Sequence, residues 1–239
     1  MKANRLPQPM TKNNLLWGPG VYGLIGHAPK AVLLRKAEAA LDAGLAVLQY
    51  REKIADTTEK EDVARALFAL CQRYQRPFVI NDTVELVAKV GADAIHLGQT
   101  DTPILQAKAK LPAQTHIGIT CHDSITLAHE AAQAGADLIA FGAFFDSTTK
   151  KNSSTCSFEI LKQACQDITV PIAVIGGITE QNVSLFSGFP ISYIAVSAAI
   201  FSGETVYENT AKLVQLFHTL RVSRYEGITP RLLPWKCFD

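Results

Sequence analysis

Two aspartates, Asp82 and Asp101, each follow a short apolar run and are the strongest candidates for chemistry in this sequence. The runs, 77–80 and 94–97, have the length and composition of buried strands, and the segment 84–90 between them has helical spacing. In parallel α/β folds, residues that follow successive strands meet at one edge of the sheet, where ligands bind. Two carboxylates brought together there repel each other unless a proton or a cation lies between them. A small number of hard oxygen ligands favours Mg²⁺, so we expect Asp82 and Asp101 to be metal ligands.

A basic segment follows the preceding apolar run. Gln49, Arg51 and Lys53 alternate along 49–53 (QYREK), so an extended chain places all three on one side. Arginine binds phosphate as a planar fork and lysine as a point charge, which suits a phosphate-rich ligand. Two alternatives stay open: the basic residues form a solvated surface that pairs with Glu52, and the aspartates are ordinary helix caps.

Hydroxyl and lysine side chains follow two later strands. Thr120 ends the run 116–120 with a hydroxyl suited to a phosphate oxygen, and His122 is either a base or part of a helix start. The loop 142–156 suits phosphate capture, although an ordinary polar surface loop is the alternative. Its candidate ligands are Ser147, Thr148, Thr149 and Lys150.

Small residues follow the last two strands. Gly176 and Gly177 come after one, and Ser197 and Ala198 after the other. Small residues let backbone N–H groups approach an anion closely, and the last two loops of barrel enzymes commonly bind phosphate. The alternative is that the glycines serve only a tight turn. With the metal and the basic residues, this predicts two anion sites, which would suit two anionic substrates or one substrate with two phosphates far apart.

The elements that must position these residues form eight strand–helix units. The apolar runs are continuous rather than alternating, as in parallel sheets covered on both faces. They span 21–25, 45–50, 77–80, 94–97, 116–120, 138–141, 172–175 and 193–197. Segments with helical spacing follow at 31–43, 58–74, 84–90, 103–111, 123–134, 158–166, 180–186 and 207–220. Predicted starts are a cap at Thr57 or Thr58, Pro103 as a first helical residue, and a cap at Asp123.

This order predicts an α/β fold, a (β/α)8 TIM barrel with a parallel sheet. A doubly wound open sheet is the alternative, but no GxGxxG follows the first strand. We expect a loose N-terminal arm at 1–19, a single catalytic barrel domain at 20–220 and a C-terminal tail at 221–239.

Composition limits the partners. The chain has 239 residues and a net charge of +1, so there is no electrostatic case for nucleic acid or a membrane surface. No run reaches the ~18 apolar residues of a membrane helix, and the first residues lack a signal-peptide core. The five cysteines match no zinc spacing and fit reduced thiols in a cytoplasmic protein. Nothing in the sequence determines the oligomeric state, which leaves a homo-oligomer open.

Taken in order, five motifs resemble those of the thiamine phosphate synthase family over roughly 21–216. They are QYREK at 49–53, IND at 80–82, HLGQTD at 96–101, STTKK at 147–151 and IGGI at 175–178. The resemblance implies a TIM-barrel transferase that joins an aminopyrimidine diphosphate to a thiazole phosphate and releases pyrophosphate. It implies Mg²⁺ at Asp82 and Asp101, and diphosphate catalysis by Arg51, Lys53 and Lys150.

The resemblance also implies two substrate subsites. The pyrimidine diphosphate would contact Gln49, Tyr50, Arg51, Glu52, Lys53, Asn81, Thr120 and Lys150. The thiazole phosphate would contact Ser147, Thr148, Thr149, Gly177, Ser197 and Ala198. This sequence departs from the family pattern at Thr120 and Ala198, where serines are usual, at Ala143, where proline is usual, and at Ser157, near an expected glycine. The segment after Ile25 has Gly26-His27 and lacks the usual acid. Two rival functions remain: the related thiazole tautomerase, with a histidine near His122 as acid or base, and a non-catalytic barrel that binds thiamine phosphates.

Overall fold

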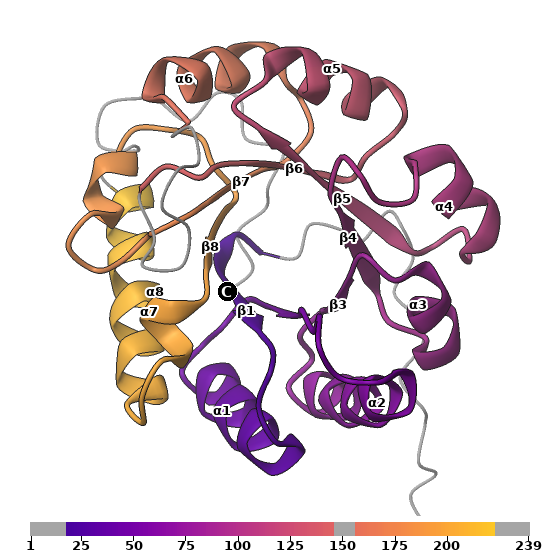
Figure 1. The fold of residues 1–239 in the computed structure, drawn as a ribbon. Helices are drawn as coiled ribbons and strands as arrows, with labels where there is room; N and C mark the ends of the chain where they lie inside the picture. Colours follow the sequence, from indigo (N-terminus) through magenta and orange to yellow (C-terminus); the bar gives the residue numbers. More distant parts are fainter. Residues whose placement is uncertain (1–17, 146–155, 223–239) are drawn as a thin grey trace, which may run out of the picture.

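Eight parallel strands close into a barrel in sequence order (Figure 1), and this confirms the predicted TIM barrel. The computed structural model describes residues 18–145 and 156–222. Pairing of β1 with β8, from Gly20 beside Tyr193 to Gly23 beside Val196, closes the sheet. The strands are β1 (Gly20–Ile25), β2 (Val47–Tyr50), β3 (Phe78–Asn81), β4 (Ala94–Leu97), β5 (His116–His122), β6 (Leu138–Phe141), β7 (Ile172–Ile175) and β8 (Tyr193–Val196).

Helices surround the barrel and cover its outer face (Figure 1). They are α1 (Lys30–Asp42), α2 (Thr57–Arg73), α3 (Val84–Val90), α4 (Ile104–Lys110), α5 (Ile125–Gln133), α6 (Phe158–Asp167), α7 (Ala198–Phe201) and α8 (Val206–Val222). The predicted helix after β7 is shorter, a 3-10 turn η2 (Val183–Phe186), and the four-residue α7 was not expected. No described helix combines the length and apolarity needed to cross a bilayer.

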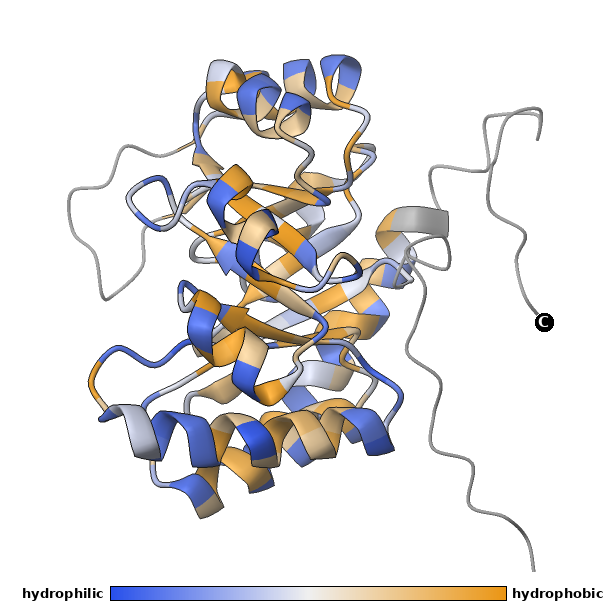
Figure 2. Ribbon diagram, turned by 90° about the vertical axis from the view of Figure 1, so that its right-hand side faces the viewer, coloured by the Kyte–Doolittle hydropathy of each residue, from blue (hydrophilic) through white to orange (hydrophobic). Residues whose placement is uncertain are grey.

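Alternation along each strand creates two apolar layers. Inward side chains fill the barrel, among them Tyr22, Val47, Val79, Ala94, Ala140, Ala173 and Tyr193. Outward side chains such as Leu48, Ile80, Ile95 and Phe141 pack against the helices. Apolar colour concentrates on the strands and polar colour on the outer turns of the helices (Figure 2). Because both faces of every strand are covered, the strands appear in the sequence as continuous apolar runs.

Polar side chains fix where several helices begin. The carboxylate of Asp56 accepts a 2.9 Å hydrogen bond from Glu59 N–H and caps α2, so the predicted cap at Thr57 or Thr58 was wrong. Ser124 rather than Asp123 caps α5, through Leu127 N–H. Pro103 occupies the cap position of α4, one residue before the predicted place. The side-chain caps at Asp56 and Ser124 satisfy N–H groups that have no partner within the helix.

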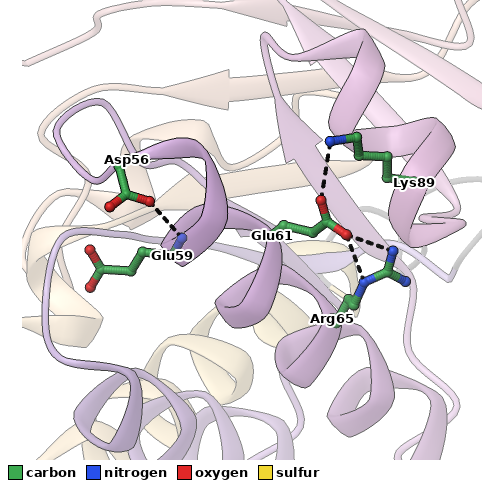
Figure 3. A network of polar contacts seen from close by, with 5 residues as sticks. All are labelled: Asp56, Glu59, Glu61, Arg65 and Lys89. Carbon is green, nitrogen blue, oxygen red and sulfur yellow. Dashed lines mark hydrogen bonds and ion pairs between the residues drawn. The ribbon is translucent and has the colours of Figure 1, made fainter.

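Helices α2 and α3 are also joined by an ion-pair network (Figure 3). The carboxylate of Glu61 accepts from Arg65 at 2.8 Å on its own helix and lies 3.2 Å from Lys89 Nζ on α3. All three side chains are at least partly exposed, so the network contributes little to stability beyond orientation of the two helices.

Candidate active site at the barrel mouth

Asp82 and Asp101 meet at the C-terminal end of the barrel, as the sequence predicts. Asp82 follows β3, has a φ of 63°, and donates its N–H to His96 O at 2.9 Å. Asp101 Oδ2 accepts from Gly98 N–H at 2.7 Å, which turns this carboxylate back toward the strand end. Burial, a hydrogen bond with Asp101 and the charge of Asp101 raise the pKa of Asp82 to about 6. The two carboxylates therefore share one small volume and repel each other.

The same place receives positive charge from the segment after β2. The charges of Lys53 and Arg51 act on Asp82 and oppose the rise of its pKa. Both basic side chains belong to exposed residues at the mouth. Two carboxylates near two cations form a polar site whose charges suit an anion that brings its own cation.

This donor set fits Mg²⁺. Magnesium is usually held by one or two carboxylates and takes its other ligands from water and substrate phosphate. Within 18–145 and 156–222, no group of three or more histidine, cysteine, aspartate or glutamate side chains could hold a metal. Asp82 and Asp101 stay the candidate metal ligands, because a cation between them would relieve the repulsion by Asp101 that, after burial, contributes to the raised pKa of Asp82.

A chain of hydrogen bonds crosses the barrel interior below the acids. The Tyr22 hydroxyl on β1 donates to Gln49 Oε1 on β2 at 2.6 Å, and Gln49 Nε2 donates to Asn81 Oδ1 on β3 at 2.7 Å. Gln49 and Tyr22 are each only 2% exposed. The chain fixes the orientation of both amides and leaves the Asn81 amide nitrogen, on a half-buried residue, as a donor.

The neighbouring strands continue this polar layer. His96 Nε2 on β4 lies 2.8 Å from Thr120 Oγ1 on β5, and Gln99 Nε2 donates to Thr120 O at 2.6 Å. Burial lowers the pKa of His96 to about 4, so its ring is neutral. A Cβ on Gly118 would lie 2.6 Å from His96 Nδ1, so this glycine makes room for the ring. Thr120 is thus held from two sides.

The ends of β7 and β8 carry the described residues that were predicted for the second anion site, and its role stays a prediction. Ile175 pairs with Ala195, so Gly177 and Ser197 follow at equal distances along neighbouring strands. Gly177 has a φ of 63°, and its carbonyl accepts from Asn182 Nδ2 at 2.9 Å. The Ser197 hydroxyl donates to Leu24 O at 2.9 Å, and Ala198 begins α7. A short extra helix after the last strand is a frequent phosphate-binding device in these barrels.

The family assignment follows from comparison with known proteins. Residues 21–200 match the family model described as thiamine monophosphate synthase. The chain belongs to this family. A thiamine-phosphate synthase of Thioalkalivibrio sulfidiphilus is 37% identical over 200 residues, which cover 83% of this chain and 95% of the relative. One from Alcanivorax borkumensis is 42% identical over 188 residues, 78% of this chain and 86% of the relative.

A solved structure similar to this chain supports the family assignment. The thiamine phosphate pyrophosphorylase of Pyrococcus furiosus is 26% identical and superposes with a TM-score of 0.77, over 85% of this chain and 98% of that chain. A 3-hexulose-6-phosphate synthase, 15% identical with a TM-score of 0.63, shows only that the fold is shared.

Two predicted site residues of this thiamine monophosphate synthase family member have side chains that are engaged elsewhere. Tyr50 is buried in the layer between barrel and helices, and the Glu52 carboxylate is directed at backbone N–H groups. His122 lies at the exposed end of β5, with a φ of 53°, and a role for it stays a prediction. Cys121 is buried, and burial raises its thiol pKa to about 12, which is unlike an activated nucleophile.

Several predictions lie outside the described residues. These are Ser147, Thr148, Thr149 and Lys150, the arm up to residue 17 and the tail from residue 223. Residues on both sides of the hydroxyl-rich loop contact β7 and η2. Phe144 and Phe145 donate their N–H groups to Ile175 O and Gly176 O at 3.1 Å, and Phe144 and Phe158 both pack on Phe186.

The part that Tyr22 takes in the polar layer was not predicted from the sequence, and neither were the contacts of His96 and Gln99 with Thr120. The sequence did carry a signal for Tyr22. This tyrosine lies in a short apolar run that forms a buried strand, and a buried tyrosine hydroxyl needs a hydrogen-bond partner.

Proposed function

We propose that this protein condenses 4-amino-2-methyl-5-(diphosphooxymethyl)pyrimidine with 4-methyl-5-(2-phosphooxyethyl)thiazole to thiamine phosphate and pyrophosphate. The observation that carries the proposal is the meeting of Arg51 and Lys53 with Asp82 and Asp101 at the barrel mouth. The names of the relatives agree with this activity. The enzyme is thus a transferase that moves a pyrimidinylmethyl group with diphosphate as the leaving group.

The proposed reaction breaks one C–O bond and forms one C–N bond. The bond between the pyrimidine methylene and diphosphate breaks, and its electron pair leaves with pyrophosphate. The amino-substituted ring stabilises the resulting methylene cation, and the lone pair of the thiazole nitrogen then forms the new bond. No proton has to be removed from the attacking nitrogen, so no activated base is required.

The leaving diphosphate carries the charge that the site must stabilise. Arg51 and Lys53 would bind its oxygens, and we assign Lys150 to the same task from the sequence. Asp82 and Asp101 would hold Mg²⁺, which when bound supplies neutralising charge to the diphosphate. Gln49, Asn81 and Thr120 would orient the pyrimidine, since the hydrogen bonds around them already fix their side chains.

The second substrate would bind at the ends of β7 and β8. Backbone N–H groups near Gly177, Ser197 and Ala198 suit the phosphate of the thiazole, and the Ser147–Thr149 hydroxyls are assigned to it from the sequence. The Ser197 hydroxyl is engaged with Leu24 O, so its contribution would come from the backbone. The apolar wall formed by Ala140, Ala173 and Ile175 would exclude water from the methylene cation.

Product analysis of the purified protein tests the proposal. With Mg²⁺ and both substrates we expect thiamine phosphate and an equal amount of pyrophosphate. Asp82→Ala and Asp101→Ala should each lower turnover at least 100-fold, whereas Asp62→Ala, which removes an exposed acid on α2, should stay within twofold of wild type. Circular dichroism should show an unchanged fold in all three.

Other outcomes distinguish the rivals. Interconversion of thiazole tautomers without release of pyrophosphate would favour the tautomerase, and tight binding of thiamine phosphate with neither activity would favour a non-catalytic barrel. Near wild-type turnover in either aspartate variant would overturn the metal assignment. We further propose a cytoplasmic setting, which the buried thiols Cys71, Cys121 and Cys156 support, and leave homo-oligomerisation to a measurement of mass in solution.

A further inference from the structure

Glu52 separates the two basic residues in sequence, yet its carboxylate is engaged by main chain. Its side chain is 4% exposed. Oε2 accepts from His27 N–H at 2.9 Å, and Oε1 accepts from Ile54 N–H at 2.6 Å and Ala55 N–H at 3.3 Å. These three donors come from two loops, the one after β1 and the one after β2. One carboxylate therefore ties the two loops together.

The backbones of the same loops are also in direct contact. Arg51 N–H donates to Ile25 O at 2.8 Å. A Cβ on Gly26 would lie 1.8 Å from Arg51 O, so only glycine permits this approach. His27 has a φ of 43°, a left-handed conformation in which its N–H reaches Glu52. The contacts hold 51–52 against 25–27 over three successive residues.

An acid between two cations would ordinarily pair with them. In the described portion of the chain, the basic side chain found beside the Glu52 carboxylate is instead His27, with Nδ1 at 3.5 Å from Oε2. Burial would raise the pKa of Glu52, but the N–H groups of Ile54, Ala55 and His27 hold it below its ordinary value, so the side chain is anionic. β2 ends at Tyr50 and the chain bends at 53–55, and the charges of Lys53 and Arg51 act on Asp82 rather than on Glu52.

We propose that Glu52 is a positioning residue for the proposed reaction: by binding the backbone of both loops it fixes the segment that presents Arg51 and Lys53 to the diphosphate. The identity of the ligand rests on the function proposed above. Glu52 itself does not touch the substrate. Its effect therefore reaches the diphosphate only through its basic neighbours, and it does not extend to the phosphate site at β7 and β8.

The substitution Glu52→Gln tests this, because an amide keeps the size of the side chain but places an N–H donor against backbone donors. Two controls match it. Glu59→Gln makes the same charge change in the first turn of α2. His27→Asn removes the imidazole but keeps the backbone N–H, in a residue type that tolerates a left-handed conformation. The first readout is calorimetric affinity for pyrophosphate in Mg²⁺. We expect about tenfold weaker binding for Glu52→Gln and less than twofold change for both controls.

Coupling to Lys53 shows whether Glu52 acts through the basic residues. In a Lys53→Ala background, Glu52→Gln should weaken pyrophosphate binding by clearly less than it does in wild type, because only Arg51 of the two groups that it positions remains. The KM for the thiazole phosphate should stay within twofold of wild type. The proposal would be overturned if Glu52→Gln bound pyrophosphate as tightly as wild type does. It would also be overturned if Glu52→Gln lost the same affinity for pyrophosphate with and without Lys53, or if binding of both substrates weakened equally.

Amide hydrogen exchange separates this inference from the proposed function. Exchange at Ile54 and Ala55 should be at least tenfold faster in Glu52→Gln than in wild type, with an unchanged melting temperature for the barrel. If wild type binds pyrophosphate but forms no thiamine phosphate, the proposed function fails, and the Glu52 comparison still decides the positioning role. If wild type binds no pyrophosphate, or exchange at these amides is unchanged, the positioning role fails.

Discussion

Asp82→Asn should stabilise the metal-free protein at neutral pH while it removes a proposed metal ligand. Partial burial, followed by the hydrogen bond with Asp101 and the charge of Asp101, raises the pKa of Asp82 to about 6, so ionisation at neutral pH costs free energy. Asparagine keeps the shape of the side chain, carries no charge and tolerates the φ of 63° at this position. The substitution therefore removes the repulsion with little change in backbone conformation.

The magnitude follows from the pKa. A rise from the ordinary 3.8 to about 6, at 1.36 kcal/mol for each pH unit, corresponds to about 3 kcal/mol. Asp82 is only half-buried, and solvent screening reduces this to about 1–2 kcal/mol. Because the folded state binds this proton more tightly than the unfolded state, wild type loses that free energy as the pH rises from about 4 to about 6. The asparagine variant does not lose it.

Urea denaturation in EDTA at several pH values measures the difference. Above pH 7 the free energy of unfolding of Asp82→Asn should exceed that of wild type by about 1–2 kcal/mol, and the excess should disappear at pH 3.5, where Asp82 is protonated in both states. Asp42→Asn, at the exposed end of α1, is the matched charge change and should stay within about 0.5 kcal/mol of wild type throughout.

Magnesium should reverse the order. A ligand present at 100 times its Kd stabilises the state that binds it by about 2.7 kcal/mol, and only wild type retains both carboxylates. Lower stability of Asp82→Asn than of wild type in EDTA at pH 7.5 would refute the reasoning, as would an excess that is independent of pH.

Three further substitutions test the elements around the site. Gln49→Leu leaves the Tyr22 hydroxyl buried without its partner and should lower the free energy of unfolding by about 1–3 kcal/mol in urea. Gly118→Ala forces a methyl group against His96 and should cost about 1–3 kcal/mol, with a shifted imidazole resonance in NMR spectra. Asp56→Ala removes the cap of α2 and should lower stability by about 1 kcal/mol, whereas Thr57→Ala should change it by less than half as much.

The fold was predictable because the covering of both sheet faces leaves a simple pattern in the sequence. All eight strands lie at the predicted runs, and helices α1 and α3 begin and end within one residue of prediction. The errors lie at helix starts. Asp56 and Thr57 are both good caps, and so are Asp123 and Ser124. Which one accepts the N–H depends on how the loop approaches the helix, and adjacent residues of the same type do not encode that.

The meeting of Asp82 and Asp101 was predictable for a different reason. In a parallel barrel, residues that closely follow a strand lie at the mouth, and Asp82 comes directly after β3 while Asp101 comes four residues after β4. Their role as metal ligands stays a prediction. The polar layer of Tyr22, Gln49 and Asn81 depends on which side chains point inward on three strands at once. A four-residue apolar run has no clear polar side, so the sequence leaves that choice open.

The side chains of the QYREK motif point in different directions, although the motif as a whole predicts one binding site. The motif predicts five contacts with one ligand, but an extended chain cannot direct five consecutive side chains to one side. Gln49 points into the barrel, Arg51 and Lys53 act on Asp82, Tyr50 enters the outer core, and the Glu52 carboxylate binds the loops. Cations on a long loop hold a diphosphate well only if that loop is fixed, since ordering it on binding would consume affinity. We therefore expect alternate positions of the motif to have different roles. Arg51 and Lys53 would bind the ligand, whereas Tyr50 and Glu52 would hold the chain in place.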